Sequence, residues 1–501
     1  MLSLVAGESR LGRFILDDPV PGLRRLQFIP VLSEKRMTQF PEEVSLLITN
    51  GFLITMDSSR RMIRDGAVAV DKDRIVWVGK ERDLEHRFEA ETVIDAKGCL
   101  VLPGFIDGHN HSIQYLSKGI GDDVHIAVWQ YERVYPFEAH LRPEDVFVGA
   151  LGNFVEMVRN GTTCYADPGG YYLEEIVHAM EGVGIRGIIS LSTRDIHDPG
   201  CPLPKELTWS TEEMIERAED SLIRWKNYSD RVRVWLSLRY TLNVSDQLCT
   251  AIKALADQYD VGIHCHCCGF SGEDQEVRKR WGVRSLERYH RLGLFGPNLY
   301  LVHMGFIRPD DIDLLKRHDV KICHCPSASM HGAYGVISRG LFPELIRAGV
   351  TVTLGTDSAT AGRFLDLVRV MYLAAAGHKD ARENPLEIGA HKALEMATIE
   401  GARGLGWDNE IGSIEEGKKA DLTIVDTKEM AWHPEGDPVS HLIYSASGSS
   451  VSTVIINGRV VMRDRKFVTI DEDELPKRID ESAENLKRRA RIHVPWKWPV
   501  Q

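Results

Sequence analysis

Three histidines and one aspartate have the types and spacing needed to hold a metal ion. His109 and His111 stand two apart at the end of an apolar run, and side chains two apart on a strand share one face. His266 follows His264 in a later run, and Asp357 ends another. Three imidazoles and a carboxylate suit Zn²⁺ with a position left for water, and Fe²⁺ or Mn²⁺ would also be accepted. The set predicts one divalent ion that lowers the pKa of water toward ~7, so that it can attack carbon.

Two groups could complete this chemistry. Asp357 could accept the proton of the attacking water and pass it to the leaving group. His303, at the end of the run LYLVH, would polarise the carbon under attack or hold the hydroxide. Other interpretations stay open: an H-x-H pair alone can be two surface histidines, and His264 is expected to support a ligand or pack rather than bind the metal.

The elements that must position these residues are eight short apolar runs that alternate with helix-length amphipathic segments. The runs are VLPGFIDGHNH, TTCYADPG, IRGIISLSTRD, VRVWLSLRY, GIHCHCC, LYLVHMGF, VKICHCPSA and TVTLGTDSA. Such alternation indicates βα units, and eight of them predict a closed (β/α)8 barrel, an α/β fold. The metal-capable residues end the runs, where barrel enzymes carry their catalytic groups.

Further β-like runs occur at both ends of the chain. They predict a small β-sandwich built from residues 45–101 and 417–470, with a catalytic barrel between them at 102–416. Residues 1–44 are an N-terminal extension without an assigned function, and residues 471–501 are expected to form a charged surface helix and a tail.

Cysteines flank two of the histidine runs. Alternation puts Cys265 and Cys267 on the face opposite His266, toward the surrounding helices, so we expect buried apolar cysteines rather than ligands. The same interpretation applied to residues 323–325 predicts outward cysteines and turns His324 toward the barrel, where it would line the pocket.

Several other polar or aromatic residues near the ends of the runs are candidates for substrate contact. Trp129 could form an aromatic wall or simply pack. Arg239 and His331 could contact a substrate, form a structural salt bridge or lie at the surface. Asp167 ends the second run and belongs to the same group of candidates.

Composition and charge narrow the class of protein. The chain has 501 residues, 43% hydrophobic and 27% charged, which is an ordinary globular balance. Its formal net charge of −12 repels phosphate backbones, so a nucleic-acid partner is not expected. The sequence has no run of the ~18–20 apolar residues that a membrane helix needs. Nine cysteines, several within apolar runs, favour a reducing cytoplasm over structural disulfides.

The order of several motifs resembles the amidohydrolase superfamily. These motifs are PGFIDGHNH, RNGTTCYAD, the H-x-H of the fifth run, LVHMGF, HCPSAS, GTDSAT and GSIEEGKKADLTIVD, spread between about Ser45 and Val468. More narrowly, the chain resembles the branch that holds s-triazine chlorohydrolases, guanine deaminase and methylthioadenosine/S-adenosylhomocysteine deaminases. The resemblance implies a barrel flanked by a small β-sandwich, hydrolysis of a small molecule at carbon, and a homodimer or higher homo-oligomer.

The resemblance also assigns roles to residues. By position, it implies that the ligands are His109, His111, His266 and Asp357, and that His303 is the catalytic histidine of the sixth strand. Binuclear members bridge two metals with a carboxylated lysine at the end of the fourth strand. Because VRVWLSLRY has no lysine, one metal per chain is expected.

One position departs from the pattern that the resemblance implies. Ring deaminases of this branch read H-x-x-E after the fifth strand, and the glutamate carries protons to the ring nitrogen. Counting from His266 gives Gly269, although Glu273 or Asp274 could reach back on a loop. Glycine is also expected to leave space for a bulkier substrate group.

Two hydrolytic functions therefore stay open. The first is deamination of an N-heterocycle, or a related displacement. The second is hydrolysis of an amide, urea or carbamate, in which Asp357 alone can protonate a leaving amine. A third alternative, from another class, is a non-catalytic metal-binding barrel.

Overall fold

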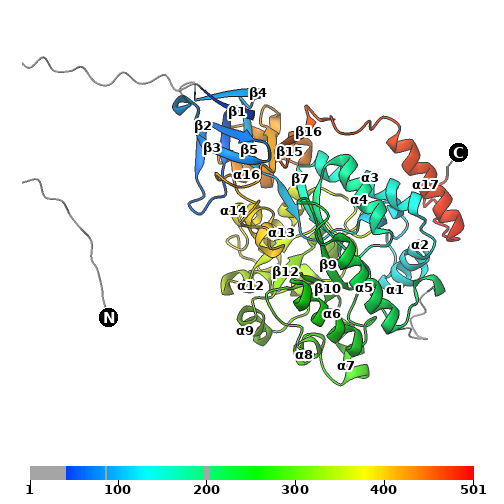
Figure 1. The fold of residues 1–501 in the computed structure, drawn as a ribbon. Helices are drawn as coiled ribbons and strands as arrows, with labels where there is room; N and C mark the ends of the chain where they lie inside the picture. Colours follow the sequence, from blue (N-terminus) through cyan, green and yellow to red (C-terminus); the bar gives the residue numbers. More distant parts are fainter. Residues whose placement is uncertain (1–40, 85–86, 197–203, 501) are drawn as a thin grey trace, which may run out of the picture. The chain divides into compact units, whose positions relative to one another are not determined.

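Eight parallel strands run in sequence around a barrel in the computed structural model, which describes residues 41–84, 87–196 and 204–500 (Figure 1). Each of the eight predicted runs contains one barrel strand, and the predicted α/β barrel is confirmed. The strands are β6 (Phe105–Asp107), β7 (Thr162–Ala166), β8 (Arg186–Ser190), β9 (Val232–Leu238), β10 (Ile263–Cys267), β11 (Leu299–His303), β12 (Lys321–His324) and β13 (Val352–Leu354).

The barrel is closed between β6 and β13 by contacts just beyond the strands, since these two strands are not paired in the described sheet. The backbone N–H of Asp357 donates to the carbonyl of His109 at 2.8 Å. The Oδ1 of Asp107 accepts from the backbone N–H groups of Thr356, at 3.0 Å, and of His109, at 3.1 Å. These bonds fix His109 and Asp357 relative to each other across the seam.

Helices connect the strands and cover the outside of the barrel (Figure 1). Local signals start several of them. The Ser210 hydroxyl, for example, accepts from the backbone of Glu213 at 3.1 Å, which caps α5. The connecting helices are α3 (Pro143–Arg159), α4 (Leu173–Val183), α5 (Thr211–Trp225), α6 (Asp246–Tyr259), α7 (Glu273–Trp281), α8 (Ser285–Arg291), α9 (Pro309–Arg317), α10 (Pro326–His331), α11 (Val336–Arg339) and α12 (Phe342–Ala348), and β13 is followed by α13 (Leu367–Ala381), α14 (Ala390–Met396) and α15 (Ile399–Gly404).

The connection between β6 and α3 carries extra short elements. They are the 3-10 helix η2 (Ser112–Ser117), α1 (Ile126–Val128), the π-helical turn η3 (Trp129–Val134) and α2 (Tyr135–Ala139). This segment follows the first two predicted ligands directly, so it is placed to cover the mouth of the barrel.

A mixed sheet combines strands from both ends of the chain, as predicted (Figure 1). In it β5 pairs with β1 on one side and with β14 on the other. The chain passes from this sheet into the barrel at Gly104, between β5 and β6. The strands are β1 (Glu42–Ile54), β2 (Met62–Asp71), β3 (Arg74–Lys80), β4 (Phe88–Asp95), β5 (Cys99–Pro103), β14 (Leu422–Asp426), β15 (Val451–Ile456), β16 (Arg459–Arg463) and β17 (Lys466–Phe467). Residues 1–40 of the predicted extension lie outside the described residues.

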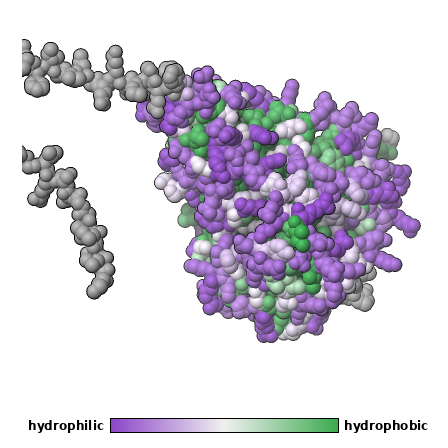
Figure 2. All heavy atoms as spheres, in the orientation of Figure 1, coloured by the Kyte–Doolittle hydropathy of each residue, from purple (hydrophilic) through white to green (hydrophobic). Residues whose placement is uncertain are grey.

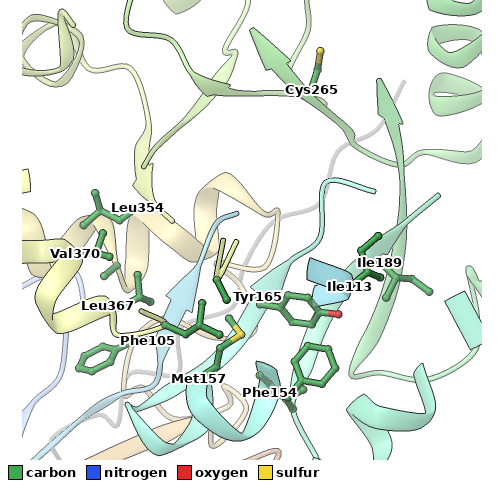
Figure 3. Close-up of a cluster of buried hydrophobic side chains, with 14 of the residues drawn as sticks. Phe105, Ile113, Phe154, Met157, Tyr165, Ile189, Cys265, Leu354, Leu367 and Val370 are labelled. Carbon is green, nitrogen blue, oxygen red and sulfur yellow. The ribbon is translucent and has the colours of Figure 1, made fainter. Parts of the chain in front are cut away.

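Buried side chains form separate clusters on the two sides of the barrel wall. Between strands and helices, Phe154 of α3 packs on Tyr165 of β7 with ring centroids 4.8 Å apart, and Figure 3 shows this neighbourhood. Inside the barrel, a second cluster includes Ile106, Ile188 and Val302. The ligand candidates sit above this interior layer.

The surface seen in Figure 2 is mostly hydrophilic, in keeping with the net charge of −12.

The predicted C-terminal helix is α17 (Leu475–Arg489), and it packs against α3. Across residues 41–84, 87–196 and 204–500, the helices are all too short or too polar to span a bilayer. The remaining short elements are α16 (Pro438–Tyr444) and the 3-10 helices η1 (Glu81–Asp83), η4 (Lys205–Leu207), η5 (Met430–Trp432) and η6 (Gly448–Ser450).

Candidate metal centre and active site

The carboxyl ends of the barrel strands bring the predicted ligands to one point. The nearest ring nitrogens of His109, His266 and His303 all lie within 4.8 Å of one another. The Nε2 of His111 lies 3.2 Å from that of His266. The Oδ1 of Asp357 lies 3.7 Å from the Nε2 of His109 and 3.8 Å from that of His111. One centre is thus surrounded by four imidazoles and a carboxylate.

These donors fit a divalent cation. The Nε2 of His109 is buried and has no hydrogen-bond partner, so a lone pair on it is free for a metal. Burial and the neighbouring imidazoles lower the pKa values of His109 and His266 well below the usual range. Both rings are therefore neutral at pH 7, which is the form that binds metal.

His264 supports this arrangement from below. Its Nε2 lies 3.0 Å from the Nδ1 of His109, and its ring meets Tyr300 edge-on with centroids 5.0 Å apart. A bond at Nδ1 orients the His109 ring and leaves Nε2 to face the centre. The structure thus puts His264 behind a candidate ligand, where it supports the His109 ring instead of facing the centre.

His111 has a neighbour that affects its fit. The Nη1 of Arg239 lies 3.0 Å from the Nδ1 of His111, and because a guanidinium can only donate, the Nδ1 of His111 accepts. A neutral ring with an accepting Nδ1 carries its proton on Nε2. Binding of a metal through Nε2 therefore requires Arg239 to release Nδ1. Of the four imidazoles, His111 is thus the least readily available as a metal ligand.

Arg239 is itself held by a buried acid that the sequence analysis missed. Glu138 of α2 accepts from Arg239 at 2.7 Å, from Arg194 at 3.0 Å and from the Gln114 amide at 2.8 Å. The flanking arginines lower the pKa of this carboxyl although burial opposes the shift. The sequence did contain a signal for this buried acid, because an acidic residue inside the largely apolar segment VYPFEAHL is unusual.

A pocket of about 740 Å³, including its open mouth, leads to the centre. Its walls are mainly apolar and aromatic, and its polar lining includes an acceptor without a partner, the Oε1 of Gln114. Side chains from the β6–α3 connection and from the loops after β9 and β10 form most of the walls: Ile126, Trp129, Val134, Tyr135, Tyr240 and Phe270. Such a pocket suits a flat ring with few polar groups.

The predicted substrate contacts divide into two groups. Trp129, Arg239 and Gly269 line the pocket, and their contact with a substrate stays a prediction. Asp167 does not line it: the Asp167 carboxylate accepts from the Ser112 hydroxyl at 2.5 Å, and burial raises its pKa to about 6. His331 bonds the carbonyl of Ala361 at 2.9 Å and also stays outside the lining.

The orientation predicted for residues 323–325 is wrong. The His324 ring stacks on Phe342 with centroids 3.8 Å apart, and its Nε2 lies 3.1 Å from that of His378, on the helix side of β12. Cys323 and Cys325 belong to the cluster inside the barrel. A two-residue period shows which residues share a face but not which face is inside. His324 therefore does not line the pocket, and the Cys325 thiol lies within 4.8 Å of donor atoms of His109 and Asp357.

Gly269 has the imidazole of His303 as a close neighbour. A Cβ at Gly269 would lie 3.2 Å from Cδ2 of His303. The imidazole of His303 thus lies directly beside this position, while Gly269 also lines the pocket, so space there for a bulkier substrate group stays a prediction.

Comparison with known proteins agrees with this geometry. The amidohydrolase family model matches residues 100–461. A 5′-deoxyadenosine deaminase of Methanosarcina acetivorans is 31% identical over 449 residues, covering 89% of this chain and 99% of the relative. A 5-methylthioadenosine/S-adenosylhomocysteine deaminase of Syntrophobacter fumaroxidans is 34% identical over 446 residues, covering 88% and 98%.

Solved structures share the fold. An adenosine deaminase of Xanthomonas campestris with bound zinc superposes with a TM-score of 0.82 at 27% identity, covering 89% of this chain and all of that one (100%). An E. coli guanine deaminase gives a TM-score of 0.72 at 22% identity, covering 84% and 98%.

Proposed function

The chain belongs to the amidohydrolase family and is a metal-dependent hydrolase of carbon–nitrogen bonds, and from this premise we propose that it deaminates an adenine nucleoside modified at the 5′ position. One observation carries the proposal: a cluster of imidazoles and Asp357 lies at the inner end of a pocket with aromatic walls. The deaminases cited above, whose names specify such nucleosides, supply the substrate class.

We propose one divalent ion, zinc first and iron or manganese as substitutes, held by His109, His111, His266 and Asp357. Bound there, the ion would lower the pKa of water so that hydroxide is available at neutral pH. The zinc in the Xanthomonas relative supports the choice of metal, and the strand β9, VRVWLSL, contains no lysine that could bridge a second ion.

The residues of the chain would then handle protons and orientation. Asp357 would take the proton of the attacking water and deliver it to the departing nitrogen. His303 would orient the carbon under attack, and Trp129 and Phe270 would bracket the ring.

The test is ammonia release from a panel of 5′-deoxyadenosine, methylthioadenosine, S-adenosylhomocysteine, adenosine and guanine. We expect the highest kcat/KM on a 5′-modified adenosine. No ammonia from any adenine nucleoside, with the metal loaded, would contradict the proposal.

Gly269 favours a second candidate. A ring deaminase protonates a ring nitrogen as hydroxide adds, and position 269 offers no side chain for this. Hydrolysis of an aryl amide, urea or carbamate needs only the proton that Asp357 would deliver to a leaving amine. Efficient release of a larger amine, with little ammonia from nucleosides, would favour this alternative.

Two measurements check the metal and its neighbours. Protein purified with metal supplied should hold about one equivalent per chain, and two equivalents both required for activity would defeat the mononuclear proposal.

Asp357→Asn should lower kcat on the order of 10²–10⁴-fold with the fold intact, because the amide cannot accept a proton. We also propose a homodimer or higher homo-oligomer, which light scattering would detect.

A further inference from the structure

Glu273, the first residue of α7, turns its carboxylate back to the loop that follows β10. Its Oε2 accepts from the backbone N–H of Gly269 at 2.8 Å. Its Oε1 accepts from the backbone N–H of Cys268 at 2.8 Å and from the Thr241 hydroxyl at 2.9 Å. The residue is 1% exposed. A carboxylate is thus hydrogen-bonded to the backbone of Gly269, the position at which ring deaminases of the resembling branch have a glutamate.

We propose that Glu273 is a positioning residue for the reaction and not a replacement for the missing acid. It does not line the pocket, and both of its oxygens already accept hydrogen bonds. Its bonds join the loop after β9 to the loop after β10, so it acts as a clamp between two walls of the site. We call this set of three bonds the Glu273 clamp.

The clamped loop is in a conformation that needs support. Cys268 has φ = 53°, in the left-handed region that a residue with a side chain rarely adopts. The N–H of Cys268 is one of the two that Glu273 holds. Such backbone conformations persist where surrounding contacts enforce them.

The loop carries parts of the active site at both of its ends. His266 lies in β10 one residue before the strand ends, and the backbone N–H of Met304, next to His303, donates to the carbonyl of Cys267 at 3.1 Å. At the other end, Phe270 stacks on Tyr240 with centroids 6.1 Å apart. Release of the clamp would therefore shift a candidate ligand, the neighbourhood of His303 and an aromatic wall together.

The first experiment compares Glu273→Gln with Glu276→Gln in the metal-loaded enzyme. Glutamine keeps the size but replaces one accepting oxygen by a donor, which must face the backbone N–H of either Cys268 or Gly269. Glu276 is the matched control, because it lies on the same helix with its side chain 45% exposed and pairs with Lys279. We expect kcat per bound metal to fall about 10- to 100-fold in E273Q, as misplacement of reacting groups does, and to stay unchanged in E276Q.

The pH profile separates positioning from proton transfer. A positioning role leaves both limbs of the kcat profile at their wild-type pH values in E273Q. Loss of one limb would mean that Glu273 is the acid itself and would overturn the proposal. A kcat per bound metal equal to that of wild type would overturn it as well.

A milder variant covers the case in which E273Q does not fold. Thr241→Val removes one of the three bonds and keeps the two from the backbone. We expect kcat per bound metal to fall about threefold, less than in E273Q, because both bonds from the backbone still hold the loop. An unchanged value would overturn the proposal.

The inference rests on the proposed function only for its turnover assay. If the wild type hydrolyses no substrate on the panel, the proposed function fails, and the clamp is judged on Co²⁺-substituted protein. Displacement of His266 should then alter the visible absorption of bound Co²⁺ in the Glu273 or Thr241 variant and not in E276Q. Identical spectra would overturn the clamp independently of any substrate.

Discussion

Two strands of the barrel, β10 and β12, carry the same Cys-His-Cys pattern and orient it in opposite directions. In β10, His266 faces the metal centre and the Cys265 thiol lies 3.1 Å from the hydroxyl of Tyr289 on α8. In β12, Cys323 belongs to the interior cluster and His324 packs on Phe342 outside. The Cys-His-Cys pattern therefore does not determine which of its residues face the inside of the barrel. The neighbours on each side of the barrel wall determine this.

The neighbours differ in a way that explains the two phases. Inside β10, His109 offers a ring nitrogen to His264 at 3.0 Å, so imidazoles are favoured there. Inside β12, the chain approaches closely: a Cβ at Gly355 would lie 2.9 Å from the Cys323 sulfur. The Cys323 sulfur is thus packed closely against Gly355 on the inner side, whereas on the outer side the His378 ring offers His324 a partner.

The largest effect should distinguish the two histidines. His266→Asn should lose the metal and lower kcat more than about 100-fold, beyond what the loss of a supporting residue costs. His324→Asn should keep about one equivalent of metal and most of its activity, because this ring lies outside the pocket. Metal analysis and kcat decide the matter, and equal metal loss in both variants would contradict the orientation of β12.

A second prediction concerns the thiol on the inner side of β12. Cys325 lies within 4.8 Å of donor atoms of His109 and Asp357, so Cys325→Ala should weaken metal binding about 10-fold, as removal of a neighbouring group does. Competition with a chelating dye measures the affinity. An affinity equal to that of wild type would show that this sulfur does not influence the centre.

The sequence predicted the fold and several of the residues that meet at the centre, but it placed Cys325 on the wrong face. Eight apolar runs predicted eight strands, and His109, His266 and Asp357 lie at or just beyond the carboxyl ends of strands that share one rim. Periodicity could not provide the phase of β12, since every residue of KICH is buried and neither face is marked by polarity.

Contacts that depend on distant segments were also beyond the sequence. Glu138 lies in the β6–α3 connection, and only folding brings it to Arg239. The imidazole of His303 lies directly beside Gly269, although the two residues belong to different loops.

A third prediction uses the outward histidine pair. Burial lowers the pKa of His378 to about 4, with Arg382 contributing and Glu344 opposing. As pH decreases, His378 therefore binds a proton in the unfolded chain, near its usual pKa of about 6.5, before it does so in the native protein. The free energy of unfolding consequently falls as pH decreases from about 6.5 toward 4. Between pH 7 and pH 5 this site should cost about 2 kcal/mol of unfolding free energy.

His378→Gln isolates that contribution. Glutamine is neutral at both pH values, so the variant should lose about 2 kcal/mol less than wild type between pH 7 and pH 5. Urea unfolding at the two pH values, with the metal chelated in both proteins, gives the difference. Equal pH dependence in the two proteins would mean that the pKa of His378 is not lowered and that solvent reaches the helix side of β12.

The smallest effect is expected for the outward thiols of β10. Cys265 and Cys267 lie in the cluster between strands and helices, and alternation keeps both away from His266. The double change to alanine should leave metal content and affinity unchanged, whereas Cys325→Ala weakens binding. Loss of two buried thiols should cost about 1–3 kcal/mol of stability through packing, and the Tyr289 hydroxyl would lose its sulfur partner. Metal loss with an intact fold would reverse the comparison: β10 would then present its cysteines inward as β12 does, and His264 and His266 would have to be reassigned to the helix side.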